Sequence, residues 1–376
     1  MKRIFSISAV LAVFVISTAF VDEIDLLALR KQYEKPIAQW PKPTIDEGID
    51  FQEFKSLAKV DSSYFTTMAQ PKVKLGKLLF FDPLLSSSSQ VSCSSCHDPQ
   101  MSFGDKRSVS LGTDHLTGSR NTPSLLNVAK RKSLFWDGRA GTLQEQAIIP
   151  LATPHEMAMD TKLLGEKLGK IKAYVALFKD AYGTETITIE NITDALAKFQ
   201  ETLVSRRSRF DRFLDGEYKA LTDQEIHGMH LFRTKARCMN CHNGEFLTDE
   251  SFHNIGLTYY KRKYNDLGRY EVTKDPKDVG KFKTPSLRDV MNNNPWMHNG
   301  LFDNITGVVN LYNSGMHMID PTPEQKAKDP LYPQTDPILQ KLNLSRDEIQ
   351  AVVAFMNAIT ATQYKMPRPE LVRDKK

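Results

Sequence analysis

Two short cysteine motifs are the residues of this 376-residue chain that most directly indicate chemistry. The four cysteines all lie in two copies of Cys-x-x-Cys-His. The copies comprise Cys93, Cys96 and His97, and Cys238, Cys241 and His242. The motif is the attachment signature of a c-type haem, in which two thiols bond to the porphyrin and the next imidazole binds the iron. Two covalently bound c-type haems are therefore predicted.

Two other chemistries use paired cysteines. Four cysteines in two C-x-x-C pairs are compatible with a zinc site, and one pair is compatible with a thioredoxin-like redox motif. Zinc does not explain why a histidine follows each pair at once, and a redox pair does not explain the duplication. The haem interpretation accounts for both features.

The amino terminus has the three parts of a secretory signal. Lys2 and Arg3 precede an apolar run over residues 4–15, and small residues follow before the acidic Asp22 and Glu23. We therefore expect residues 1–21 to be a signal peptide. Covalent haem attachment takes place outside the cytoplasmic membrane, so a periplasmic location is expected. No second apolar stretch has membrane length, so we expect no membrane span after signal removal.

Charge and length limit the partners and the architecture. The formal net charge is +5, and part of it leaves with the signal. This mildly basic balance suits an acidic electron-transfer partner and is far below a nucleic-acid footprint, so no nucleic-acid partner is expected. About 355 mature residues exceed one hydrophobic core, which predicts two domains.

An internal repeat supports the division into two domains. Three landmarks recur in the same order around each haem motif: a Gly-containing helical segment at 76–80 and 228–232, a Thr-Pro-Ser-Leu segment at 122–125 and 284–287, and a glycine turn at 137–138 and 299–300. We predict a mainly α fold of two cytochrome c-like haem domains, residues 71–215 and 216–376, related by internal duplication. Long loops and little strand are expected. Residues 22–70 form an N-terminal extension.

Local patterns predict individual elements. Apolar residues at 192–203 recur at three and four positions and predict a helix, which Asn191 or Thr193 would cap. Ser345 is expected to begin another helix, with acidic residues in its first turn. The best strand signal, at residues 186–189, is short.

Several segments resemble the bacterial di-haem cytochrome c peroxidases, whose relatives include the methylamine-utilisation di-haem oxidase. They are Arg-Asn-Thr-Pro at 120–123, Phe-Trp-Asp-Gly-Arg-Ala at 135–140 and Pro-His-Glu-Met at 154–157, together with the first haem motif. The resemblance runs from about residue 75 to about residue 356. It implies a peroxidase that reduces hydrogen peroxide with electrons from a small cytochrome c or cupredoxin.

The resemblance also implies roles for single residues. Electrons would enter at the second haem and pass through Trp136 to the first, where peroxide binds. Glu156 matches the distal acid–base residue, because a carboxylate near the iron can move a proton between the two peroxide oxygens. Burial should raise its pKa. Gln146 matches a glutamine that lines this pocket.

The distal ligands are left open by the residues. His115 is the one histidine on the loop after the first haem motif, and it is either the distal ligand there or an exposed loop residue. At the second haem, Tyr312 stands at the position where the peroxidases have a methionine ligand. The methylamine-utilisation oxidase has a tyrosine at this position. Met316 is the alternative ligand in this chain. Phenolate lowers a haem potential and thioether raises it.

Three further expectations concern a metal ion, the assembly and the activity. The resemblance implies one calcium ion between the domains at Asn121, Asn293 and Pro295, held mostly by carbonyl oxygens and waters. A homodimer is one option for the assembly. The alternatives to a peroxidase are a di-haem oxidase that modifies a protein substrate, which Tyr312 favours, and a non-catalytic electron-transfer cytochrome.

Overall fold

The structure, a computed structural model, describes residues 25–361 and 366–374. The predicted signal peptide, residues 1–21, lies outside the described residues. The fold consists of short helices joined by long loops, and the described part of the chain has one two-stranded antiparallel sheet. The prediction of a mainly α chain with little strand is confirmed.

The α-helices in chain order are α1 (Leu26–Tyr33), α2 (Ser62–Ala69), α3 (Pro71–Phe81), α4 (Cys93–Cys96), α5 (Leu143–Ala152), α6 (Thr161–Gly169), α7 (Lys172–Tyr182), α8 (Ile189–Gln200), α9 (Arg209–Leu214), α10 (Asp223–Arg233), α11 (Tyr270–Thr273), α12 (Ile305–Asn313), α13 (Pro323–Lys328) and α14 (Arg346–Ala358). The sheet pairs β1 (Phe252–His253) with β2 (Phe282–Lys283). Short 3-10 helices cover Ile37–Gln39, Pro83–Leu85, Pro99–Met101, Thr113–His115, Val128–Lys130, Tyr218–Ala220, Cys238–Asn240, Pro276–Asp278 and Val290–Asn292.

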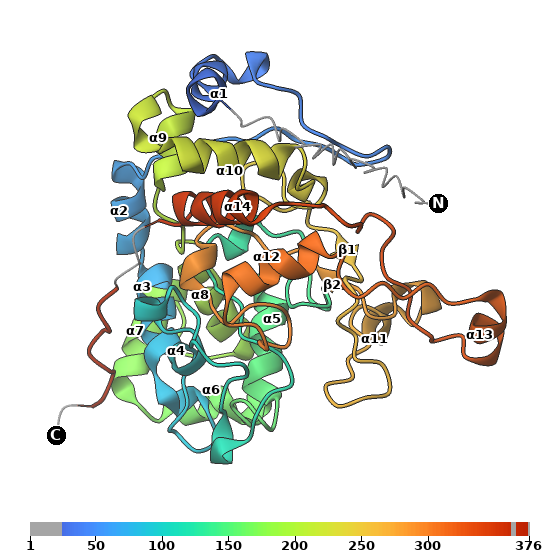
Figure 1. The fold of residues 1–376 in the computed structure, drawn as a ribbon. Coiled ribbons are helices and arrows are strands. Elements are labelled where there is room, and N and C mark those ends of the chain that lie inside the picture. Colours follow the sequence, from blue (N-terminus) through green and yellow to red (C-terminus); the bar gives the residue numbers. More distant parts are fainter. Residues whose placement is uncertain (1–24, 362–365, 375–376) are drawn as a thin grey trace, which may run out of the picture.

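The two halves are built around equivalent helix pairs. In the first half α3 packs on α8, and in the second α10 packs on α14 (Figure 1). Both pairs cross at a glycine. A Cβ at Gly76 would lie 1.8 Å from the carbonyl oxygen of Ala195, and a Cβ at Gly228 would lie 1.8 Å from that of Ala351. Only glycine permits this approach of two backbones, and its recurrence confirms the internal duplication.

Helix starts follow capping chemistry. Ser345 caps α14, as predicted from the sequence. Its hydroxyl accepts from the N–H of Glu348, and the Glu348 carboxylate accepts from the N–H of Ser345. The prediction for α8 is wrong in detail, because Thr188 is the cap and the helix begins at Ile189. Residues 186–188 form neither a helix nor a strand, and they lead into α8 through Thr188, whose backbone is extended.

The N-terminal extension packs against the second half. Arg233 on α10 is 1% exposed. Its guanidinium lies over the rings of Trp40 and Phe54, and it forms an ion pair with Glu53. The extension therefore shields a charged group that α10 would otherwise bury alone, which gives it a structural role.

The C-terminal tail returns to the first half. Met366 belongs to the first hydrophobic core. Arg373 pairs with the buried Asp82, and Asp374 accepts from backbone N–H groups at the start of α7. In Figure 1 this tail runs beside α3 and α7. Each end of the described chain thus covers the half that is farther from it in sequence.

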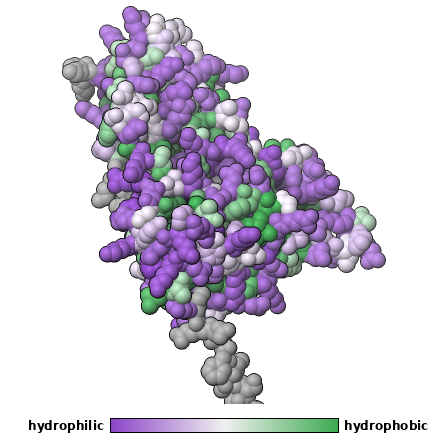
Figure 2. All heavy atoms as spheres, turned by 90° about the horizontal axis from the view of Figure 1, so that it is seen from above, coloured by the Kyte–Doolittle hydropathy of each residue, from purple (hydrophilic) through white to green (hydrophobic). Residues whose placement is uncertain are grey.

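The surface is mainly polar. Figure 2 shows hydrophilic side chains over most of one face, with apolar residues in small separate patches. A lobe that includes α11 and α13 projects to one side in Figure 1. Within the described ranges, no helix has the length and apolar character needed to cross a membrane.

Candidate active site

Each haem motif forms a single helical turn. The N–H of His97 donates to the carbonyl of Cys93 at 3.0 Å, and the N–H of His242 donates to that of Cys238 at 2.8 Å. The turn places both cysteines and the histidine of a motif on one side of the chain. Cys93 packs against the first core and Cys238 against the second, so the pairs cannot combine in one zinc site.

The two proximal imidazoles are oriented in the same way. Nδ1 of His97 donates to the carbonyl of Phe103 at 3.0 Å, and Nδ1 of His242 donates to that of Leu247 at 3.1 Å. A carbonyl only accepts, so Nδ1 carries the proton and Nε2 keeps its lone pair for a metal. Burial lowers the pKa of both imidazoles, which favours the neutral ligand form. These residues fit a c-type haem at each motif.

Glu156 lies near the cysteines of the first motif. Burial, with smaller contributions from Cys96 and the Glu156 carboxylate, raises the pKa of the Cys93 thiol to about 12. Burial also raises the pKa of Glu156 above its usual value, although the positive charges of His155 and Arg139 oppose the shift. The Glu156 side chain is 37% exposed. A carboxyl group with a raised pKa that lies near the cysteines of the motif and is partly exposed to solvent can exchange protons.

The backbone around Glu156 is held by the loop that carries His115. Both the N–H and the hydroxyl of Thr113 donate to the Glu156 carbonyl, at 2.7 and 2.9 Å. A Cβ at Gly112 would lie 2.2 Å from the carbonyl oxygen of His155, so the loop and this turn touch. The side chain of His115 is exposed. Sequence reasoning missed Gly112, since its partner lies more than 40 residues away along the chain.

Gln146 lies on α5 and is half-buried. It is one turn before Pro150, and the Pro150 carbonyl accepts from the N–H of Met157. Residues four apart share one face of a helix, so Gln146 lies on the same face of α5 as Pro150.

Trp136 lies at the junction of the halves. Its indole N–H donates to the carbonyl of Asn121 at 2.9 Å, and its own carbonyl accepts from the N–H of Lys283 in the second half at 2.8 Å. Its ring is 6.5 Å from that of His298. Contacts from both halves therefore fix the indole, which suits an aromatic group that carries electrons between two centres.

The residue after Trp136 anchors a charged network across the junction. The buried Asp137 pairs with Arg120 at 2.6 Å and with Arg139 at 3.0 Å. Arg120 also pairs with Asp266, and Arg269 donates to the Asp137 carbonyl. Sequence reasoning used Asp137 as a repeat landmark and as part of the 135–140 segment, and assigned it no ion pair. Arg139 is two residues away, but Arg120 comes from a separate segment, and no local pattern reveals that pair.

A buried histidine at the junction has an unsatisfied ring nitrogen. His298 stacks on Phe282 with ring centroids 3.5 Å apart. Its Nε2 has no hydrogen-bond partner among the described residues, and burial lowers its pKa to about 4. A buried polar atom of this kind is costly unless a further group satisfies it. A carboxylate of a bound haem could accept a hydrogen bond from this nitrogen. The unpaired nitrogen is therefore a second observation that fits a bound haem.

Tyr312 lies near the cysteines of the second motif. Burial, with smaller contributions from Cys241 and Cys238, raises the pKa of its phenol. It stands near the end of α12, where its carbonyl accepts from the N–H of Gly315 at 3.0 Å, and its hydroxyl makes no hydrogen bond within the described part of the chain. Met316 is also buried, with a left-handed backbone. The Tyr312 phenol is therefore close enough to the cysteines of the second motif for their charges to act on it.

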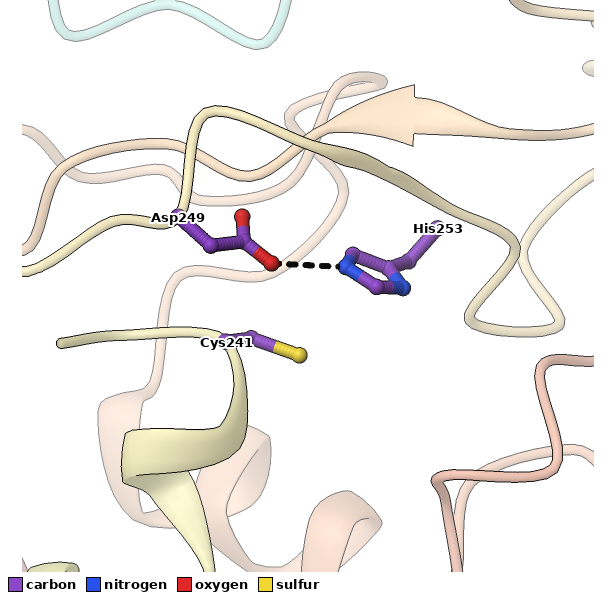
Figure 3. A group of neighbouring side chains, drawn as sticks. All are labelled: Cys241, Asp249 and His253. Carbon is purple, nitrogen blue, oxygen red and sulfur yellow. Dashed lines mark hydrogen bonds and ion pairs between the residues drawn. The ribbon is translucent and has the colours of Figure 1, made fainter. Parts of the chain in front are cut away.

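One group near the second motif has the composition of a metal site. Cys241, Asp249 and His253 place ligand-type atoms within 4.8 Å of one another (Figure 3). Both ring nitrogens of His253 are already bonded, to Asp249 at 2.9 Å and to Asp336 at 2.6 Å. Burial opposes its protonation, but these carboxylates raise its pKa to about 12. The imidazolium has no lone pair for a metal, so the group is an ion cluster that supports the second motif.

The three residues predicted for calcium lie at the junction, but their surroundings do not suit that ion. Calcium takes six to eight oxygen ligands. The amide NH₂ of Asn121 donates to the Arg107 carbonyl at 2.8 Å. The cavity beside Asn121 and Asn293 has a volume of about 10 Å³, enough for about one water. The ammonium of Lys106 already bonds to oxygens of residues 292 and 294, next to Pro295.

Known proteins share this arrangement over most of the chain. The sequence profile of the di-haem cytochrome c peroxidase family matches residues 70–219. Methylamine utilization protein MauG of Methylophilus methylotrophus is 36% identical over 324 residues, 85% of this chain and 91% of that protein. Cytochrome c551 peroxidase of Nitrosomonas europaea is 34% identical over 297 residues, 78% of this chain and 82% of that protein.

A solved structure has a similar fold. The crystal structure of a MauG-like protein associated with microbial copper homeostasis matches with a TM-score of 0.68 at 29% identity. The match covers 85% of this chain and 93% of that one.

Proposed function

This chain belongs to the di-haem cytochrome c peroxidase family, whose members carry two c-type haems, and from that premise we propose that it is a periplasmic peroxidase. The proposed reaction is H₂O₂ + 2 e⁻ + 2 H⁺ → 2 H₂O. A small cytochrome c or cupredoxin would supply the electrons. The observation that carries the proposal is the carboxyl group of Glu156, which lies beside Cys93 and Cys96 and has a raised pKa.

The two motifs would hold the haems in equivalent ways. Cys93 and Cys96 would attach the first haem, and Cys238 and Cys241 the second, with His97 and His242 presenting Nε2 to the iron. When bound, the haems supply an iron centre for peroxide and a store for electrons.

Glu156 would handle the protons. As a carboxylate it can accept a proton from one oxygen of peroxide, and as a carboxylic acid it can give that proton to the oxygen that leaves as water. The raised pKa brings the two forms closer in free energy near neutral pH. Its partial exposure allows the second proton to come from solvent. Gln146 would line the same pocket.

Trp136 would carry electrons from the second haem to the first. Its indole is fixed from both halves, by Asn121 and Lys283, so its position does not depend on one domain alone. The mildly basic chain suits an acidic donor protein.

We propose that the distal side of the first haem is open in the oxidised protein, because the His115 side chain is exposed. The electron paramagnetic resonance spectrum of the oxidised holoprotein tests this point. We expect one high-spin ferric signal. Two low-spin signals that become one after His115→Ala would instead identify His115 as the ligand.

A protein-modifying oxidase is the second candidate, and Tyr312 favours it. An oxygen ligand at the second haem stabilises ferric iron and lowers its reduction potential, which is a disadvantage for a simple electron-entry site. The phenol lies beside Cys238 and Cys241, which supports its assignment as that ligand.

Turnover of the purified holoprotein separates the candidates. Hydrogen peroxide and a reduced small cytochrome or cupredoxin are mixed with it, and donor oxidation is followed by absorbance. We expect two donors oxidised per peroxide. Electron exchange with the donor but no peroxide consumption would indicate a non-catalytic cytochrome. Peroxide consumption that oxidises protein side chains and not the donor would indicate the oxidase.

A further inference from the structure

Lys106 joins the two halves of the molecule. It lies on the loop after the first haem motif, and its ammonium reaches the second half. There it donates to the carbonyl of Asn292 and, at 2.7 Å, to Oδ1 of Asn294. Both acceptors belong to the loop around the 3-10 helix Val290–Asn292. The contact places one positive charge among oxygen atoms at the junction.

The backbone at Lys106 adopts a conformation that side chains disfavour. Its φ is 59°, in the left-handed region where a Cβ crowds the neighbouring carbonyl. A strained residue persists when its surroundings hold it in place. Within the described ranges, the hydrogen bonds of the Lys106 side chain are the two to Asn292 and Asn294. They are therefore the contacts that hold this conformation.

The surroundings of the ammonium are rich in oxygen. The small cavity beside it is also lined by Asp105, Asn121 and Asn293. Oδ1 of Asn293 is buried with no partner among the described residues. Such a cluster of carbonyl, amide and carboxylate oxygens attracts a cation. Room for about one water leaves no space for the hydrated ion that a carbonyl-and-water site requires.

We propose that the Lys106 ammonium is the cation that joins the two halves of this protein, in the place where the sequence resemblance predicts calcium. The oxygen atoms of the junction bind a charge that is part of the chain. A chelator cannot remove it, and no metal has to be acquired during export.

The lysine contact is close to the proposed electron relay. The side-chain NH₂ of Asn121 donates to the carbonyl of Arg107, the residue after Lys106, at 2.8 Å. The carbonyl of Asn121 accepts from the indole of Trp136, and its N–H donates to the carbonyl of His298 at 2.7 Å. Lys106 thus secures the loop that holds Asn121, whose carbonyl accepts the hydrogen bond of the Trp136 indole. The proposal itself does not require peroxidase activity.

Calcium content gives the first test. Holoprotein purified without chelators and dialysed against calcium-free buffer is analysed by inductively coupled plasma mass spectrometry, and its melting temperature is compared with and without EDTA. We expect far less than one calcium per chain and no change in melting temperature. One calcium per chain, removed by EDTA with a fall in melting temperature, would overturn the proposal.

Two matched variants give the second test. Lys106→Met removes the charge and keeps the left-handed strain, and Lys162→Met changes an exposed lysine on α6 that makes no side-chain bond within the described chain. We expect Lys106→Met to melt about 3 °C lower, from the loss of charged hydrogen bonds in a chain of this length. Hydrogen exchange at residues 104–108 and 290–295 should be faster. Equal melting and exchange in both variants would contradict the proposal.

Discussion

Replacing Glu156 by glutamine tests the proposed chemistry most directly. The change keeps the size of the side chain and removes its ability to accept a proton. General acid–base catalysis typically contributes 10²- to 10⁴-fold, or about 3–5 kcal/mol of transition-state stabilisation. Asp105 is the other carboxylate whose charge reaches Cys96. Its oxygens already accept from the Arg107 N–H and the Ser110 hydroxyl, so it should not replace Glu156.

The pH profile has a defined direction. Burial raises the pKa of Glu156, so the carboxylate that takes the first proton forms at a higher pH than for an ordinary glutamate. Wild-type kcat/KM should rise with pH through this raised pKa. The small residual activity of Glu156→Gln should lack this pH-dependent rise.

Stability separates loss of chemistry from loss of folding. A raised pKa in the folded state means that the contribution of Glu156 to stability is present below the unfolded value and is lost as pH rises through the folded value. Glutamine stays neutral at every pH. The variant should therefore be no less stable than the wild type at pH 7, with both haems attached.

The assay is steady-state peroxide reduction at saturating donor, with haem content measured by absorbance. Glu166→Gln is the matched control, because Glu166 is exposed on α6 and pairs only with Lys170. We expect the control to have wild-type activity and Glu156→Gln to lose at least about 10²-fold. Activity within threefold of the wild type in Glu156→Gln would refute the reasoning.

Three further changes have expected outcomes. Trp136→Phe removes the N–H bonded to Asn121 and should slow electron transfer between the haems at least tenfold, while the second haem is still reduced at the wild-type rate in stopped-flow absorbance; unchanged transfer would exclude the relay. Tyr312→Met should raise the potential of the second haem in spectroelectrochemical titration, and an unchanged potential would show that Tyr312 is not its ligand. Asp211→Asn leaves the buried Arg288 without its partner carboxylate, and denaturant unfolding should show a loss of about 3–5 kcal/mol. A loss below about 1 kcal/mol would mean that solvent reaches this pair.

Local chemistry explains what could be predicted from the sequence. The cysteine and histidine of each motif must be close in the chain to attach and bind one haem, so the pattern is visible without a structure. The same holds for Ser345 and Glu348, which cap one helix turn. The glycines at 76 and 228 were recognisable only as matched landmarks. Glycine is needed at these positions because another helix crosses close to the backbone there, and that helix is more than 100 residues away along the chain.

Long-range contacts explain what could not be predicted. Arg233 is an ordinary charged residue in the sequence, and its burial between Trp40 and Phe54 arises from a segment about 180 residues earlier. His253 resembles a metal ligand by type. Asp249 is four residues before it, but its second carboxylate partner, Asp336, lies 83 residues away along the chain. The Lys106 contact depends on the position of one half against the other, for which one sequence contains no periodic signal.

Duplication explains why the halves can share a proximal design and still differ in chemistry. His97 and His242 each donate Nδ1–H to a carbonyl whose residue has a left-handed φ, so the proximal arrangement has been retained in both copies. The differences lie on other segments. Glu156 stands beside the first pair of cysteines, where in the proposed function it would move protons, whereas Tyr312 stands beside the second, where it would offer an oxygen ligand. To transfer peroxide reduction from the first half to the second, these segments would therefore have to change, and the haem motifs could stay as they are.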